Sequence, residues 1–234
     1  MDTPLKITYT YIFPGSDEQS FELLLNAKTL NLITQPRDSP PPWALLTHNQ
    51  CINCPLDSSR HRFCPVALNF VDVAEQFAHR VSYEEVRVIV TTAERTYLKD
   101  TALQQGLSSL LGVVMTTSGC PVMEPLKPMV QMHLPFATLA ETVFRAVSMF
   151  LLAQYLRFGE TKPMKFGLKG LAGIYAEVAI VNRDFVQRLR EAATEDADIN
   201  ALMSLDCFAT MVPLIAEHML KEIRPYFSAY FDEP

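Results

Sequence analysis

Four cysteines in the chain have a spacing suited to a single metal centre. Cys51 and Cys54 form a Cys-x2-Cys pair, which lets two thiolates reach one ion or cluster from a tight turn. Cys64 and Cys120 follow, and three of the four cysteines immediately precede a proline. The sequence therefore predicts a four-cysteine metal site made by Cys51, Cys54, Cys64 and Cys120.

The Cys-Pro step favours the start of a helix. Proline is tolerated at the first helical position and pushes the preceding residue into an extended conformation. Cys64 is therefore expected to cap a helix over residues 65–79. A sulfur at a helix N-terminus meets free backbone N–H groups and the positive end of the helix dipole, which favours the thiolate. Cys120 is expected at the C-terminal end of one helix, just before a short helix from Pro121.

Other interpretations of the cysteines stay open. They could be small buried thiols, or Cys51 and Cys54 could form a dithiol redox pair, although the βαβ context of a thioredoxin-like motif is missing. His61 and His133 are the substitute ligands for the site. A solvated basic loop is favoured for His61, and a hydrogen-bonded core position for His133. Cys207 lies in a helical pattern and is expected to be a buried small hydrophobe.

The ligand set suits either zinc or a 4Fe–4S cluster. Pro55 stands where zinc ribbons commonly have a glycine, and the x2, x9 and long spacing matches no standard cluster motif. Zinc is slightly favoured because it needs no dedicated assembly machinery.

The composition excludes several classes of protein. The 234 residues are 49% hydrophobic and 20% charged, which is typical of a globular chain with a sizeable core. The formal net charge of -6 leaves no excess of basic residues to neutralise phosphates, so no nucleic-acid partner is expected. No secretory signal is visible, and the most apolar stretch, residues 146–156, is shorter than the roughly 20 residues of a membrane-spanning helix. A soluble, cytoplasmic protein without a membrane partner is predicted.

The first third of the chain predicts antiparallel strands. Residues 7–13 and 21–25 alternate between apolar and polar side chains around a Pro-Gly-Ser-Asp break, which indicates a hairpin. Residues 29–34 predict a third strand of a meander, and residues 43–46 a further short strand. Alternating valines over residues 86–91 predict another strand or an extended segment.

Beyond residue 65 the pattern is mostly helical. Apolar side chains at helical spacing predict helices over 101–118 and 168–193. Thr138 and Glu141 form a capping-box pattern that opens a long helix. Asp198 is expected to cap the last helical region, which Pro213 should kink or divide.

These elements predict an α+β fold in which a small N-terminal antiparallel β-meander packs on a predominantly helical body. We expect one compact domain over residues 1–234, with a β-rich part at 1–50 and a mainly helical part at 51–234. The cysteine site is expected at the junction of the two parts. The chain ends in an aromatic tail that is too apolar to stay in water, so it is expected to pack on the body or on a second subunit. The tail comprises Tyr226, Phe227, Tyr230 and Phe231.

Three cysteine motifs resemble those of a family of uncharacterised bacterial proteins of similar length. They are Cys-x2-Cys-Pro-Leu at 51–56, Cys-Pro-Val-Ala-Leu-Asn at 64–69 and Ser-Gly-Cys-Pro-Val-Met at 118–123. The resemblance extends from Lys6 to about Tyr226. It implies a bacterial cytoplasmic setting and no particular substrate.

The leading functional prediction is a non-enzymatic metal-binding module with a structural or regulatory role. One alternative is an iron–sulfur or thiol redox protein that transfers electrons or senses redox state. Another is a metal-free helical scaffold that binds a protein partner or a second copy through the aromatic tail. The sequence has no P-loop, Gly-x-Ser-x-Gly, Gly-x-Gly-x-x-Gly or His-Glu-x-x-His motif, and it leaves enzymatic activity open.

Overall fold

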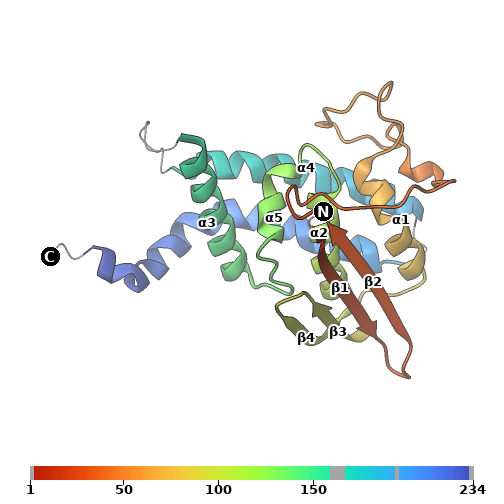
Figure 1. Cartoon of the computed structure of the whole chain (residues 1–234), viewed down its shortest axis with the longest axis horizontal. Coiled ribbons are helices and arrows are strands. Elements are labelled where there is room, and N and C mark those ends of the chain that lie inside the picture. The colour runs from red at the N-terminus through yellow and green to blue at the C-terminus, as the bar shows by residue number, and fades with distance from the viewer. Residues whose placement is uncertain (1–2, 159–166, 193–194, 232–234) are drawn as a thin grey trace.

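The computed structural model describes residues 3–158, 167–192 and 195–231, and these residues form an antiparallel sheet and a larger group of helices (Figure 1). The predicted α+β class is confirmed. The strands are β1 (Leu5–Ile12), β2 (Glu18–Leu25), β3 (Glu85–Thr91) and β4 (Thr96–Ala102). The α-helices are α1 (Pro65–Phe77), α2 (Leu103–Thr117), α3 (Leu139–Phe158), α4 (Lys169–Ala192) and α5 (Ala197–Ile223). Short 3-10 segments are η1 (Pro42–Ala44), η2 (Glu124–Val130) and η4 (Arg224–Tyr230).

The sheet has the strand order β2-β1-β3-β4, and every neighbouring pair is antiparallel. The predicted hairpin is confirmed as β1 and β2. The predicted third strand over 29–34 is wrong, because only an isolated bridge joins Leu32 to Leu25. On the other side of β1 the sheet continues with β3, whose Val86, Val88 and Val90 are buried, whereas Leu32 beside β2 is only half-buried.

Two further expectations about the strands are corrected. Residues 43–46 form η1 and a single bridge between Leu45 and Phe63, since consecutive prolines before Trp43 remove the backbone donors that a strand needs. The edge strand β4 is not recognisable from alternating apolar residues in the sequence, because none of its side chains is buried. With β3 and β4 both beyond residue 50, the β-rich part is not confined to residues 1–50.

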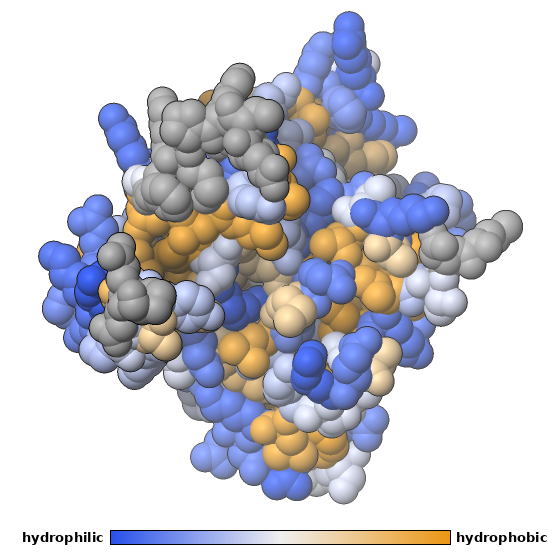
Figure 2. Space-filling view, turned by 60° about the vertical axis from the view of Figure 1, so that its left-hand side comes forward, coloured by the Kyte–Doolittle hydropathy of each residue, from blue (hydrophilic) through white to orange (hydrophobic). Residues whose placement is uncertain are grey.

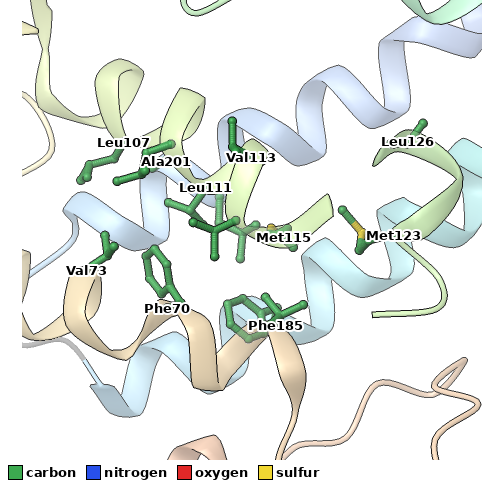
Figure 3. Packing of buried hydrophobic residues seen from close by; sticks show 14 of the residues in the cluster. Phe70, Val73, Leu107, Leu111, Val113, Met115, Met123, Leu126, Phe185 and Ala201 are labelled. Atoms are coloured by element: carbon green, nitrogen blue, oxygen red, sulfur yellow. The ribbon is translucent and has the colours of Figure 1, made fainter. Parts of the chain in front are cut away.

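One face of the sheet packs on α1 and α2, which explains the alternating burial of β1 and β3. The Tyr11 hydroxyl donates to the Gly106 carbonyl at 3.1 Å, and the Phe77 ring of α1 lies edge-on to Tyr11. A Cβ at Gly106 would lie 2.8 Å from Val88, so the glycine allows α2 to approach the sheet this closely. On its other side α2 packs mainly on α5, and Leu111 of α2 lies in the same buried cluster as Phe185 of α4 (Figure 3).

Local capping rules account for the helix ends. The extended Cys64 precedes α1, and Gly119, with a φ of +90°, follows the end of α2. The Thr138 and Glu141 capping box is formed, with the Thr138 N–H donating to Glu141 Oε2 at 2.7 Å.

The last helix departs from its prediction. Asp196, and not Asp198, occupies the N-cap position of α5, while Asp198 is buried inside the first turn. Pro213 does not divide α5, which continues as one element over 27 residues.

Among the described residues, two helical spans are long and apolar enough, by length and composition alone, to cross a membrane. They are Leu139–Arg157 and Ala197–Tyr230. Within the most apolar window of each span, 22% and 28% of the residues, respectively, are buried. The apolar stretch recognised in the sequence is thus part of a longer helix. Core helices of soluble proteins pass the same criterion, so this is weak evidence of membrane association.

Candidate metal centre

The Cys-x2-Cys turn docks on helix α4. The Cys54 N–H donates to the Cys51 carbonyl at 3.0 Å, which closes the turn. Between the two cysteines, the Ile52 N–H donates to Asp184 Oδ2 at 2.9 Å, and Asn53 Nδ2 donates to the Glu177 carboxylate at 2.8 Å. These contacts tie the turn to a helix and not to a strand. The expected position at the junction of sheet and body is therefore corrected to a position within the helical part.

Cys64 reaches the same region from the start of α1. Its backbone N–H donates to the Ala44 carbonyl at 2.9 Å, and its side chain is 8% exposed. Burial raises the pKa of this thiol, and the backbone N–H groups of Ala67 and Val66 act in the opposite direction. The Cys64 side chain forms no capping hydrogen bond with these N–H groups. The predicted position of Cys64 before the helix is confirmed.

Cys120 follows α2 and begins a tight turn that leads into η2. The Met123 N–H donates to the Cys120 carbonyl at 3.1 Å, and the Cys120 N–H donates to Ser118 Oγ at 3.3 Å. Burial raises the pKa of the Cys120 thiol, while the N–H groups of Met123 and Val122 lower it. Cys120 thus sits in the same kind of environment as Cys64, with backbone donors facing a buried sulfur.

The four thiols lie close enough for their charges to act on one another. The pKa of Cys51 is raised to about 12, first by burial and then by the negative charges of Cys64, Asp184, Cys120 and Cys54. Cys54 and Cys64 also contribute to the raised pKa of Cys120. Segments up to 69 residues apart in sequence, from position 51 to position 120, therefore bring their sulfurs into one cluster.

A buried arginine stands beside these thiols. The Arg188 side chain, on α4, is 1% exposed, and its Nη1 donates to the carbonyls of Trp43 and Leu45 at 2.5 and 2.6 Å. Nη2 donates to the Asn49 carbonyl at 3.4 Å. Burial lowers the pKa of Arg188, and the nearby thiolates of the cluster, including Cys64, oppose that effect.

Sequence inspection missed Arg188, although a signal was present. Arg188 recurs at helical spacing with the buried residues Val181 and Phe185. A charged side chain on the apolar face of a helix usually has a buried partner. Asp184, which accepts from the turn at Ile52, escaped notice in the same way.

The other candidate ligands lie elsewhere. His61 is exposed, and the His133 ring is held under the sheet, with Nε2 2.6 Å from the Tyr9 hydroxyl. The expected hydrogen bond of His133 is thus present, and the side chain is half-buried. Cys207 is exposed, and its predicted burial is wrong, because α5 turns other residues, such as Ala209 and Val212, toward the core.

The thiols converge without being closed around one point. Within residues 3–158, 167–192 and 195–231, no group of three or more His, Cys, Asp or Glu side chains is arranged as a set of metal ligands. All five cysteines are free of disulfide bonds.

The fold and the cluster define a helix-rich α+β protein with four thiols gathered among helices α1, α2 and α4. Residues 7–228 match the model of a family described as a domain of unknown function (DUF6901), and the chain belongs to this family. The resemblance to an uncharacterised family is confirmed at this level. No curated protein and no solved structure matches the chain.

Proposed function

We propose that Cys51, Cys54, Cys64 and Cys120 hold one metal centre that fixes the Cys-x2-Cys turn to the helical body. The observation that carries this proposal is the placement of the cysteines: Cys64 and Cys120 are buried before α1 and after α2, and the turn that carries Cys51 and Cys54 docks on α4. The thiols also contribute to one another's raised pKa values. Four thiolates are a common ligand set for structural zinc and for iron–sulfur clusters.

The surroundings of the sulfurs fit an anionic metal–thiolate group. Backbone N–H groups face Cys64 and Cys120, and the guanidinium of Arg188 lies nearby. Among the residues described, Nε of Arg188 has no hydrogen-bond partner. These positive groups would offset the charge that remains when four thiolates bind one ion or cluster.

Zinc is the metal that we propose first. It would cross-link three chain segments and hold a fixed charge, which suits a structural or regulatory module. A 4Fe–4S cluster uses the same ligands and would add electron transfer or redox sensing. The two are distinguished by metal content and by the visible absorption of the cluster.

A pair of reactive free thiols is less well supported. Burial raises the pKa of Cys51, Cys64 and Cys120, so without metal these groups are protonated near neutral pH and are poor nucleophiles. Five free cysteines suit a reducing compartment, and a cytoplasmic location is part of the proposal.

The substitution Cys64→Ser should remove the metal. Wild-type protein purified without oxygen is expected to contain about one zinc, or one cluster, per chain, and the variant less than about a tenth of that, because a hydroxyl is a poor ligand for these metals. Elemental analysis combined with an absorption spectrum measures both outcomes.

Cys207→Ser is the matched control, since Cys207 is the exposed cysteine on α5. It should retain the wild-type metal content. Equal metal in the Cys64 variant, or no metal in the wild-type protein, would contradict the proposed centre.

We also propose that the aromatic tail contacts a partner protein, first of all a second copy of the chain. No residue of η4 is buried, and Tyr226 and Tyr230 are 81% and 84% exposed. Figure 1 shows this end of the chain projecting from the body, and Figure 2 shows apolar patches on the face that comes forward with it. The body therefore leaves the tail uncovered.

Deletion of residues 226–234 should convert an oligomer into a monomer. Light scattering coupled to size-exclusion chromatography measures the mass of both proteins. A full-length chain that is already monomeric at high concentration would remove the second copy as partner.

A further inference from the structure

A cavity of about 400 Å³ lies between α2, η2, α3, α4 and α5. None of the clustered cysteines lines it. The wall is largely apolar and includes Val113, Leu126, Met129, Phe136, Val178 and Phe208. Its size falls in the range of small-molecule binding sites, which are mostly apolar with a few polar groups that orient the ligand.

The charged side chains of the cavity are all cationic. Lys99 and Arg145 line it, and no Asp or Glu is found among the lining residues of the described chain. His133 also lines the cavity, but burial and the charge of Arg145 lower its pKa to about 4, so this ring is neutral near pH 7. The site therefore presents a positive charge to whatever enters it.

Arg145, on α3, has one hydrogen bond and no ion pair among the described residues. Its Nη2 donates to the Met129 carbonyl at 2.8 Å. Within the described ranges no carboxylate lies at salt-bridge distance from its guanidinium. The side chain is half-buried, and the exposed Glu141 carboxylate on the same helix acts on it electrostatically without forming an ion pair. A partly desolvated cation that is not held in an ion pair favours binding of an anion. Tyr175 lies beside it, since its hydroxyl also faces Met129, 4.0 Å from Sδ.

A second polar group lies further along the same wall. Asn182, on α4, is 1% exposed, and its Oδ1 has no hydrogen-bond partner among the described residues. It follows Tyr175 by seven residues on the same helix face, with Val178 between them. At 1.5 Å per residue this places Asn182 about 10 Å from Tyr175 along the helix. A buried amide oxygen without a partner costs stability, which a ligand donor would recover.

We propose that this cavity binds a small carboxylic acid with an elongated apolar body and a hydrogen-bonding group at its far end. The carboxylate pairs with Arg145, the apolar body contacts Val178 and Met129, and the distal group bonds to Asn182. This proposal goes beyond the metal centre and does not depend on it. Met123, labelled in Figure 3, lines the cavity and lies three residues after Cys120, so the two sites share the turn before η2.

The test is calorimetric titration of the purified full-length protein with decanoate, decanol and ω-hydroxydecanoate. Decanoate is expected to bind at least about tenfold more tightly than decanol, the equivalent of one charge-assisted hydrogen bond. The ω-hydroxy acid should bind more tightly than decanoate, since its hydroxyl can donate to Asn182.

Three variants assign these preferences to residues. Arg145→Gln should abolish the advantage of decanoate over decanol, and Asn182→Leu should abolish the advantage of the ω-hydroxy acid. Arg190→Gln is the matched control, because Arg190 is exposed on α4 and does not line the cavity. It should bind all three compounds as the wild type does.

Three results would overturn the proposal. They are no binding of decanoate at millimolar concentration, equal affinity of the wild type for decanol and decanoate, and unchanged decanoate affinity in a folded Arg145→Gln protein. If the Arg145→Gln protein does not fold, decylamine is titrated into the wild-type protein instead. Decylamine must then bind more weakly than decanoate. Metal content is measured in the same samples, so loss of the metal centre and loss of ligand binding are scored separately.

Discussion

Replacement of Arg188 by methionine is expected to lower the free energy of unfolding by about 3 to 5 kcal/mol. The guanidinium donates to the carbonyls of Trp43, Leu45 and Asn49, which belong to the segment before the Cys-x2-Cys turn. Methionine fills a similar volume but leaves these acceptors unpaired. Hydrogen bonds to a charged group contribute about 1.5 to 3 kcal/mol each, and the loss is greatest where water cannot replace them.

Urea denaturation measures this effect. Arg190→Met is the control, since Arg190 lies on the exposed side of the same helix and should change stability by no more than about 0.5 kcal/mol. The Arg188 variant should also bind less metal, because the nearby thiolates lose their cation. A variant within about 1 kcal/mol of the control would show that Arg188 does not hold this segment.

The second large effect is a loss of stability with rising pH caused by Asp198. Burial raises the pKa of this carboxyl to about 8, and neither carboxylate oxygen has a hydrogen-bond partner among the described residues. In the unfolded chain an Asp has a pKa near 3.9. Between these values the folded state holds a proton that the unfolded state has released, so stability falls as pH rises and levels off above pH 8.

The expected fall is roughly 1 to 2 kcal/mol between pH 6.5 and pH 8. This window avoids most of the opposing contribution of His133, whose lowered pKa makes stability rise with pH mainly below its unfolded value near 6.5. Above pH 8 the buried thiols begin to contribute, since their unfolded pKa is near 8.5. Urea denaturation across the window gives the slope.

Asp198→Asn should flatten this profile and stabilise the protein at pH 7 by about 4 kcal/mol, the cost of keeping the carboxyl protonated about three pH units above its unfolded pKa. The control Asp38→Asn changes an exposed carboxylate and should keep the wild-type slope. If the Asp198→Asn protein retains that slope, another group carries the pH dependence.

Several features could be predicted because they depend on neighbours in the chain. Alternation over residues 7–13 is enough for β1, since successive strand side chains point to opposite faces. Cys64 before Pro65 fixes a helix start, and Thr138 with Glu141 fixes another, because capping involves residues within one turn. The Cys-x2-Cys spacing likewise identified two members of the thiol cluster.

Other features depend on which faces meet after folding. The second partner of β1 is β3, about 80 residues further on, and no local pattern in the chain could reveal that pairing. The burial of Cys207 was predicted wrongly because the face of α5 that meets the core is set by its neighbours. The position of the thiol turn on α4, and not beside the sheet, follows from the side-chain contacts of Asn53.

The chain's residue pattern thus specifies its local elements, its reduced cysteines and its membership of an α+β class. The assembled helices specify the convergence of four sulfurs, the placement of Arg188 against three carbonyls and the cavity between Arg145 and Asn182. The physical reason is the separation in sequence over which each kind of interaction acts. Hydrophobic periodicity and capping act within a few residues, whereas burial, charge and cavity shape arise from side chains that are distant in sequence and become neighbours only when the helices pack.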